Sequence, residues 1–416
     1  MKKRNQVLSL ALAGAMSVSL LAGCSSSAQG GGTADTTSGD SSSAATGDTA
    51  SAGEEDNVIR IGVVGPLTGG SAIYGEGAQN AINMAVEEIN ASGGPYTVEI
   101  VNGGEIADDA QDAKQAMNAY NRVMADDPDA VVGSFFSSVT LPMAAQAATD
   151  NMLLLATGAT NVDVTKDRPT VFRDCFIDPY QGKMAALFVQ SQGYSKVAVM
   201  YANDDDYSNR LKDAFIENCE ALGIEVVDTE QCVTTDTDFT SQLSKVVASG
   251  AEFLYYPAFQ DTVPLVVNQA RSAGFTGAIM GGDGWDSSDT TGLETQFDNC
   301  YFTNHYSSED TSDAVVNFVT KYTEKYGTES LNACASLYYD AIYMLYQAAQ
   351  NGGGTDTASL VKGMTGMTFT GVGGTFTLDE NGDPAKQIVV NSFVDGQVQW
   401  YETLGPDGSV VSKRDA

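Results

Sequence analysis

Two rounds of alternating strand-like and helix-like segments run through this 416-residue sequence. In the first round, apolar residues recur at helical spacing between short runs of strand-forming residues. These strand-like runs are residues 59–64, 96–101, 130–132 and 152–155. Strands that alternate with helices pair in parallel, because each helix returns the chain to the same edge of the sheet. The first half is therefore predicted to be a parallel sheet covered by helices.

The same alternation begins again after Asp178. The strand-like runs of this second round are residues 196–201, 224–227 and 253–256. A third helical block at 313–350 precedes two glycine-rich hairpins, at 371–376 and 387–393. The sequence therefore predicts an α/β fold with two doubly wound, parallel-sheet lobes.

The N-terminus has the pattern of an export signal. Three basic residues at positions 2–4 precede an uncharged, mostly apolar run at 7–21. The run is shorter than the ~20 residues that a helix needs to cross a bilayer, so a permanent membrane span is the weaker interpretation. Residues 21–24, Leu-Ala-Gly-Cys, resemble the bacterial lipobox, whose cysteine is lipidated and becomes the first residue of the mature protein. We predict a lipoprotein signal peptide at 1–23 and a lipid on Cys24; the alternative is a stray cysteine beside an ordinary cleavage site.

The segment that follows Cys24 is predicted to be a linker. From Ser25 to Asn57 it contains only small and polar residues and acids, so it cannot bury a core. A coil of this length spans roughly 30 Å, from about 5–6 Å times the square root of its length. Residues 24–57 are therefore expected to tether the folded part to the membrane.

The composition excludes several classes of function. With 54 acidic and 21 basic residues, the chain has a formal charge of -33, which repels nucleic acid and anionic lipid surfaces. His305 is the only histidine, so a Ser-His-Asp triad would depend on it, and zinc sites with two imidazoles are excluded. The sequence also lacks the GxGxxG, GxxxxGK[ST], GxSxG and HExxH signatures at the expected places. We therefore expect no catalysis, no cofactor, no metal and no nucleic-acid partner.

Five cysteines follow Cys24, and none of them forms a CxxC pair. The odd number leaves at least one free thiol if a disulfide forms, with Cys219 and Cys232 the nearest pair. We favour buried, apolar thiols, and leave a disulfide open.

Candidate ligand-binding residues lie in the loops that follow the predicted strands, where open α/β sheets bind ligands. Ser137 and Thr160 supply hydroxyl groups beside backbone N–H groups, which together can bind an anion. Asp283, between two glycines, can bind a cation. Each has an ordinary alternative, because Ser and Thr often cap helices and Asp beside Gly is a common turn residue.

An ordered set of short segments resembles the branched-chain amino acid binding proteins, which have the type I periplasmic binding fold of ABC importers. The resemblance extends from Val58 to Trp400. It is carried by residues 61–68, 87–90, 158–161, 172–173, 281–286, 301–303 and 339–341. Together and in this order, the segments indicate the family.

The resemblance implies a role for each candidate residue. It places Ser137, Gly158 and Thr160 at the ligand carboxylate, and Asp283 at the ligand ammonium. Tyr74, Tyr207 and Phe259 match aromatic positions that line the side-chain pocket, although ordinary core packing explains most aromatic residues. Phe135 and Phe136 are larger than the residues usual in that loop. The resemblance therefore does not fix the size of the ligand that the pocket accommodates.

The resemblance also implies an architecture with three crossovers between two lobes, near Asp178, near His305 and near Asp379. The N-terminal lobe would contain residues 58–177 and 306–378, and the C-terminal lobe residues 178–305 and 379–416.

The function implied is a monomeric solute-binding lipoprotein on the outer face of the cell membrane. It would capture a branched-chain or other apolar amino acid and deliver it to the membrane subunits of an ABC permease. Three alternatives stay open: a sensory module for a signalling partner, a binder of an amide or urea, and a cell-surface hydrolase. The sequence leaves the particular amino acid, the affinity and the permease undetermined.

Overall fold

The computed structural model describes residues 57–414. The predicted signal peptide, the predicted lipid on Cys24 and nearly all of the predicted linker lie outside the described residues. Among residues 57–414, no helix combines the length and the apolar composition that a membrane span requires. The described residues contain two large sheets, here called the first sheet and the second sheet.

The first sheet is parallel throughout and has the strand order β2-β1-β4-β5-β6, with β3 paired to β1. Its strands are β1 (Val58–Gly65), β2 (Thr97–Ile100), β3 (Ala107–Asp108), β4 (Ala130–Val132), β5 (Leu153–Ala156) and β6 (Val171–Arg173). Strands β4 and β5 are buried along their whole length, as expected where helices cover both faces of a parallel sheet. The first three predicted strand-like runs overlap β1, β2 and β4, and the fourth overlaps β5.

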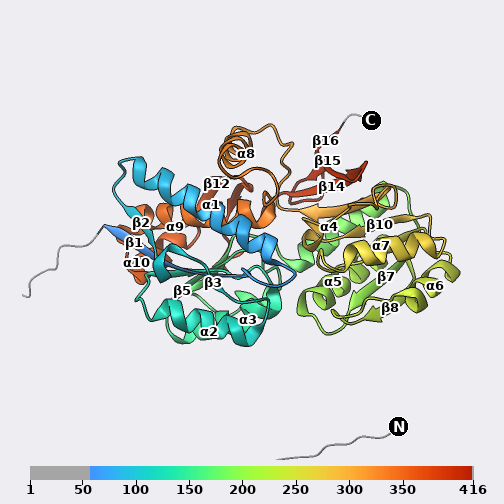
Figure 1. The fold of residues 1–416 in the computed structure, drawn as a ribbon, viewed down its shortest axis with the longest axis horizontal. Coiled ribbons are helices and arrows are strands. Elements are labelled where there is room, and N and C mark those ends of the chain that lie inside the picture. The colour runs from blue at the N-terminus through green and yellow to red at the C-terminus, as the bar shows by residue number, and fades with distance from the viewer. Residues whose placement is uncertain (1–56, 415–416) are drawn as a thin grey trace, which may run out of the picture. The chain divides into compact units, whose positions relative to one another are not determined.

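Helices cover both faces of the first sheet. On one face α1 (Ala72–Ala91) packs against α9 (Ala333–Gly352), and on the other α2 (Ala113–Met124) packs against α3 (Ser137–Thr149) (Figure 1). Helix α10 (Thr357–Met364) packs against α9. The chain therefore returns to the first sheet long after its strands are complete.

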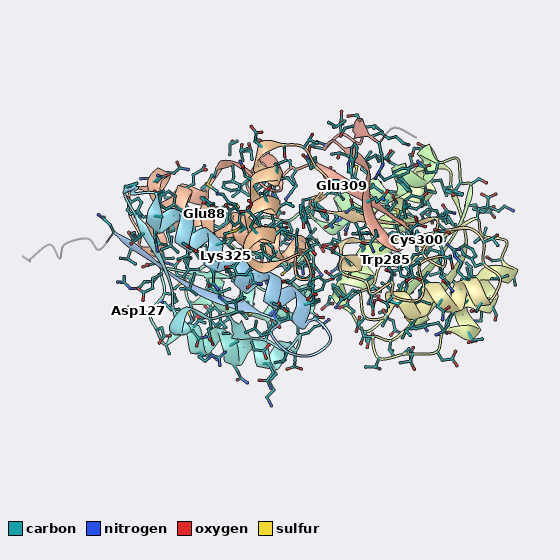
Figure 2. All side chains as sticks on the ribbon, turned by 45° about the horizontal axis from the view of Figure 1, so that its top comes forward. Glu88, Asp127, Trp285, Cys300, Glu309 and Lys325 are labelled. Carbon is teal, nitrogen blue, oxygen red and sulfur yellow. The ribbon has the colours of Figure 1, made fainter. Side chains whose placement is uncertain are left out.

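The predicted third helical block is two helices. Helix α8 (Asp313–Tyr326) is followed by Gly327, which adopts a positive φ of 82°, and α9 begins six residues after this glycine. Ion pairs join α8 to α1, from Lys321 to Glu88 at 2.9 Å and from Lys325 to Glu87. Glu88 and Lys325 are labelled in Figure 2.

The second sheet has the strand order β16-β15-β14-β11-β10-β9-β7-β8. Its strands are β7 (Lys196–Ala202), β8 (Glu225–Cys232), β9 (Phe253–Tyr255), β10 (Ala278–Gly281), β11 (Cys300–Asn304), β14 (Ile388–Val394), β15 (Gln397–Leu404) and β16 (Val410–Lys413). Strands β7, β8 and β9 overlap the predicted runs and pair in parallel, as predicted. Strands β10 and β11, which lie outside the predicted runs, continue the parallel pairing, whereas β14, β15 and β16 extend the sheet in antiparallel fashion. The second sheet is therefore mixed.

Alternate residues of the second sheet pack against different helices. Val197 and Val199 belong to one core cluster with α4 (Asp178–Ser191) and α5 (Asp206–Leu222). Ala198 and Met200 belong to another, with α6 (Thr240–Ala248) and α7 (Val263–Ser272). This division follows from the two-residue period of a strand, which sends successive side chains to opposite faces.

The remaining elements are short. They are the 3₁₀ turns η1 (Asn102–Gly104), η2 (Val162–Val164) and η3 (Asp283–Trp285), and the hairpin of β12 (Thr368–Gly371) and β13 (Gly374–Thr377). The proposed boundaries of the two lobes stay a prediction.

The five cysteines of the described part are free and buried, which answers the question that the sequence left open. Burial raises the pKa of Cys232 to about 11 and that of Cys219 and Cys300 to about 12. They therefore behave as small apolar core residues.

Candidate ligand-binding site

Two loops at the carboxyl edge of the first sheet bring hydrogen-bond donors close together. Ser137 is the first residue of α3, and its hydroxyl accepts a hydrogen bond from the backbone N–H of Asn161, at 3.3 Å. Thr160 is fully buried, and within residues 57–414 its Oγ1 has no hydrogen-bond partner of normal geometry. The first turn of α3 lacks a side-chain cap. Free backbone N–H groups and a hydroxyl can together bind an anion.

Gly158 cannot be replaced by a larger residue in this loop. Its φ of +93° is unfavourable for side chains, and a Cβ atom there would lie 2.4 Å from the ring of Phe135. The ring of Phe135 therefore covers the loop that carries Thr160.

Arg173, at the end of β6, fixes the shape of the same loop. The buried guanidinium donates to the carbonyl oxygens of Ala159, at 2.8 Å, and Asn161, at 3.0 Å, on either side of Thr160. It also forms an ion pair with Asp383 in which Nε and Oδ1 are 2.6 Å apart. The arginine thus ties the loop to the segment that precedes β14.

Asp283 lies opposite these loops, at the carboxyl end of β10, and is only 2% exposed. Its Oδ1 accepts hydrogen bonds from the Tyr207 hydroxyl at 2.9 Å and from Gln181 Nε2 at 2.8 Å. Its Oδ2 lies 3.0 Å from His305 Nε2. The carboxylate is therefore held by side chains from α5, from α4 and from the end of β11.

A second buried carboxylate, Asp178, lies in the first turn of α4. Its backbone N–H donates to the carbonyl oxygen of Thr160, at 2.9 Å. Within the described residues, neither carboxylate oxygen has a hydrogen-bond partner of normal geometry. Burial raises the pKa of Asp178 to about 8, although the nearby hydroxyl of Thr160 favours the ionised form. Asp178 lines a hollow of about 180 Å³ together with Arg210 and Asp213.

A continuous set of aromatic rings connects the two sides of the site. Tyr74 stacks on Phe135 with ring centroids 4.8 Å apart, and Phe135 contacts Phe136 edge-on at 5.5 Å. Phe136 contacts Phe259 edge-on at 4.8 Å, and Phe259 stacks on Tyr207 at 4.8 Å. The rings give the site an apolar wall.

The turn after β10 also bonds to elements around the first sheet. The Tyr74 hydroxyl donates to the carbonyl oxygen of Asp286 at 2.6 Å, and the Asp286 carboxylate accepts from the backbone N–H of Ala333, at the start of α9. Trp285, labelled in Figure 2, lies within this turn and is fully buried. An ion pair between Arg210 and Asp163, at 2.8 Å, adds a more exposed contact. Asp283 is therefore part of the segment that joins the two sides.

The structure brings together the residues that the sequence singled out. Tyr74, Phe259 and Tyr207 belong to the ring set, Tyr207 also contacts Asp283, and Ser137, Gly158 and Thr160 lie in the two loops described above. The binding roles of these residues remain proposals. Sequence reasoning missed Gln181, Arg173 and the site-facing position of Asp178 and His305. Arg173 lies in the segment 172–173 that carries the family resemblance, whereas the other three were signalled only by the polar character of the segments predicted to be crossovers.

The two sheets, the donor groups in the loops at their carboxyl edges and the buried carboxylate of Asp283 are suited to a two-sided solute-binding protein. A family model described as periplasmic binding protein matches residues 58–397. The chain belongs to this family and has its type I fold. The family consists of solute-binding proteins rather than enzymes, which confirms the expectation of a non-catalytic protein.

Individual proteins of known name or structure are also similar to this chain. A leucine-, isoleucine-, valine-, threonine-, and alanine-binding protein of Pseudomonas aeruginosa is 27% identical over 332 residues, which cover 79% of this chain and 87% of the relative. The crystal structure of the leucine binding protein LivK from Thermotoga maritima matches with a TM-score of 0.78 and 30% identity, over 84% of this chain and all of the other. The solute binding protein of an ABC transporter from R. palustris, in complex with benzoate, has a TM-score of 0.74. It is 18% identical, over 82% of this chain and 95% of its own, and shows the fold alone.

Proposed function

We propose that this protein captures a branched-chain or other apolar amino acid outside the cell and delivers it to an ABC permease. The observation that carries the proposal is the buried carboxylate of Asp283 opposite the donor loops of Ser137 and Thr160. A free amino acid carries one negative and one positive group a few ångströms apart. The site offers partners for both, and its aromatic wall suits an apolar side chain.

Delivery would depend on closure of two lobes, with the boundaries predicted above. The bonds of Tyr74 and Asp286 to the other side are the contacts that closure would form. A permease that recognises the closed form would then receive only loaded protein, because ligand shifts the population toward closure. The relatives named for leucine binding support an amino acid as the ligand.

A thermal-shift screen of free amino acids tests the function. L-Leucine at about 100 times its dissociation constant should raise the free energy of unfolding by about 2.7 kcal/mol, because it binds only the folded protein. D-Leucine is the matched control, since it has the same groups with the wrong geometry. A screen in which no amino acid shifts the transition, while amides or urea do, would contradict the proposal.

A carboxylate without an ammonium group is a second candidate, and one observation favours it. Asp283 already has three side-chain hydrogen-bond partners without any ligand ammonium. An aromatic carboxylate such as benzoate would need only the donor loops and the ring set. Including benzoate in the screen decides between the two ligand classes.

The proposed location is the outer face of the cell membrane, with a lipid on Cys24. Replacing Cys24 by Ala should release the protein into the soluble extracytoplasmic fraction, because the lipidated thiol would be lost. Cell fractionation and immunoblotting measure this, with Cys300→Ala, a change at a buried thiol, as the control that should stay on the membrane. Full membrane retention of the Cys24→Ala protein would contradict the anchor.

A further inference from the structure

The single histidine of the sequence lies buried against the proposed ammonium partner. His305 follows β11, and its Nε2 is 3.0 Å from Asp283 Oδ2. Its ring stacks on Phe176, with centroids 4.0 Å apart and planes at 21°. The stacking holds the imidazole ring in the orientation in which Nε2 contacts Asp283.

The two oxygens of Asp283 differ in what they can still accept. Oδ1 already receives two hydrogen bonds, from Tyr207 and Gln181. Oδ2 has one partner, His305. A carboxylate oxygen accepts about two hydrogen bonds, so Oδ2 has capacity for one more donor. A ligand ammonium that reaches Asp283 would therefore bind next to the imidazole and share this oxygen with it.

The other ring nitrogen shows which charge state fits the protein. His305 Nδ1 is buried and has no hydrogen-bond partner among residues 57–414. A neutral ring can donate from Nε2 to Asp283 and leave Nδ1 as a bare acceptor. A protonated ring would bury a second N–H group without an acceptor, which costs free energy. The contacts therefore favour the neutral ring, and the pair with Asp283 then carries one net negative charge.

We infer that His305 is a specificity-determining residue that reserves the charge of Asp283 for a ligand bearing an ammonium group. The neutral ring orients the carboxylate and leaves its charge uncompensated. A protonated ring compensates that charge itself, so an ammonium ligand is bound weakly in acid. The inference rests on the proposed function and names its ligand class as zwitterionic amino acids, bound in competition with a proton on His305.

The charged groups around His305 agree with this reading. Burial lowers the pKa of His305 from its ordinary value of 6.5, and Lys386 acts in the same direction, while Asp283 opposes both. The contribution of His305 to the affinity for an amino acid should therefore be constant above pH 6.5 and fall as the pH drops through the pKa of the ring. The sign follows because the ligand binds the form that lacks the proton.

Other groups near the site titrate differently. Asp178, on the first turn of α4, has a pKa of about 8 and stays protonated below pH 6.5 in the free protein. Burial raises the pKa values of Tyr207 and Tyr255 well above 10, so both stay neutral. Burial raises the pKa of Asp205 and of Asp286 to about 6, so both carboxyl groups also titrate below pH 6.5. A variant at position 305 is needed to separate their effects from that of the imidazole.

The first test uses the unaltered protein, purified without a histidine tag. Because the sequence has one histidine, imidazole ¹H–¹⁵N spectra report on His305 alone. We expect the tautomer protonated at Nε2, and a fall of at least one pH unit in the pKa of the ring when L-leucine is bound. A ring pKa that does not move on binding would overturn the inference.

The second test compares His305→Gln, whose amide can still donate to Asp283 but does not titrate. Calorimetry should show the dissociation constant of L-leucine in the unaltered protein rising up to tenfold for each pH unit below the ring's pKa, in addition to any change that both proteins share. The variant should lack this additional slope. Equal slopes in the two proteins would overturn the inference, even if the variant binds more weakly overall.

The ligand 4-methylpentanoate, which is leucine without its amino group, separates the two levels of the proposal. Its affinity should lack the additional loss below pH 6.5, because it does not compete for Asp283. If L-leucine binds and the pKa of the His305 ring does not change, only the inference about His305 is contradicted. If no ligand with an ammonium group binds at any pH, the proposed function falls and the inference with it.

Discussion

Replacing Asp283 by Asn should weaken the binding of L-leucine by about 30-fold to several thousand-fold. The amide keeps the shape of the side chain but removes the charge that would compensate the ligand ammonium at this buried position. An uncompensated buried charge costs about 2–5 kcal/mol, and each 1.4 kcal/mol is a factor of ten in affinity. Calorimetry at pH 7.5, where His305 is neutral, measures the change.

Two controls isolate the charge of Asp283. Asp289→Asn removes an exposed carboxylate from the same segment and should leave the affinity within about twofold. The affinity of 4-methylpentanoate should be nearly equal in the Asp283→Asn and unaltered proteins. A change below about threefold for L-leucine would mean that Asp283 is a structural turn residue, and a ligand without an ammonium group would then fit better.

Replacing Arg173 by Met should lower the free energy of unfolding by about 3–5 kcal/mol. The variant leaves the carbonyl oxygen of Ala159 without its arginine donor, leaves that of Asn161 with only the backbone N–H of Val164, and leaves Asp383 without its ion-pair partner. Because both carbonyl groups flank Thr160, the loop should also lose its shape, and L-leucine should bind less tightly. Urea unfolding gives the stability, and calorimetry well below the unfolding transition gives the affinity.

Arg122→Met is the matched control, because Arg122 is exposed at the end of α2. It should change the free energy of unfolding by less than about 0.5 kcal/mol. If Arg173→Met cost no more than this control, the buried guanidinium would not be the element that holds the Thr160 loop.

Much of the fold could be predicted from the sequence, because each strand and helix has its own short pattern of apolar residues. Predicted runs such as 130–132 coincide with strands that are buried on both faces, where apolar composition alone gives the signal. The hairpin predicted at 387–393 is instead the single strand β14, which pairs in antiparallel fashion with β11 and β15, because the turn lies after Val394 and not within the predicted segment. β8 runs to Cys232, beyond the predicted end at 227, because its mixed polar and apolar residues hide its period.

Only some of the candidate site residues could be predicted from the sequence. Residues in loops after strands, such as Thr160 and Asp283, could be found because the edge of the sheet at which they lie follows from the strand order. Gln181 and His305 reach the same place from a helix and from the end of another strand. Their contact with Asp283 depends on how these elements pack in three dimensions, which no local spacing encodes. The sequence therefore predicted Asp283 but not its hydrogen-bond partners Gln181 and His305, which determine how much of its charge is compensated.

The buried cysteines have a consequence for how this chain matures. A thiol reacts with oxidants as the thiolate, and burial raises the pKa of each of the five described cysteines well above physiological pH. The described domain therefore gains its stability from non-covalent packing, without cross-links. Its maturation after export would need no thiol oxidase or disulfide isomerase, and the finished domain should be indifferent to the redox state of its surroundings.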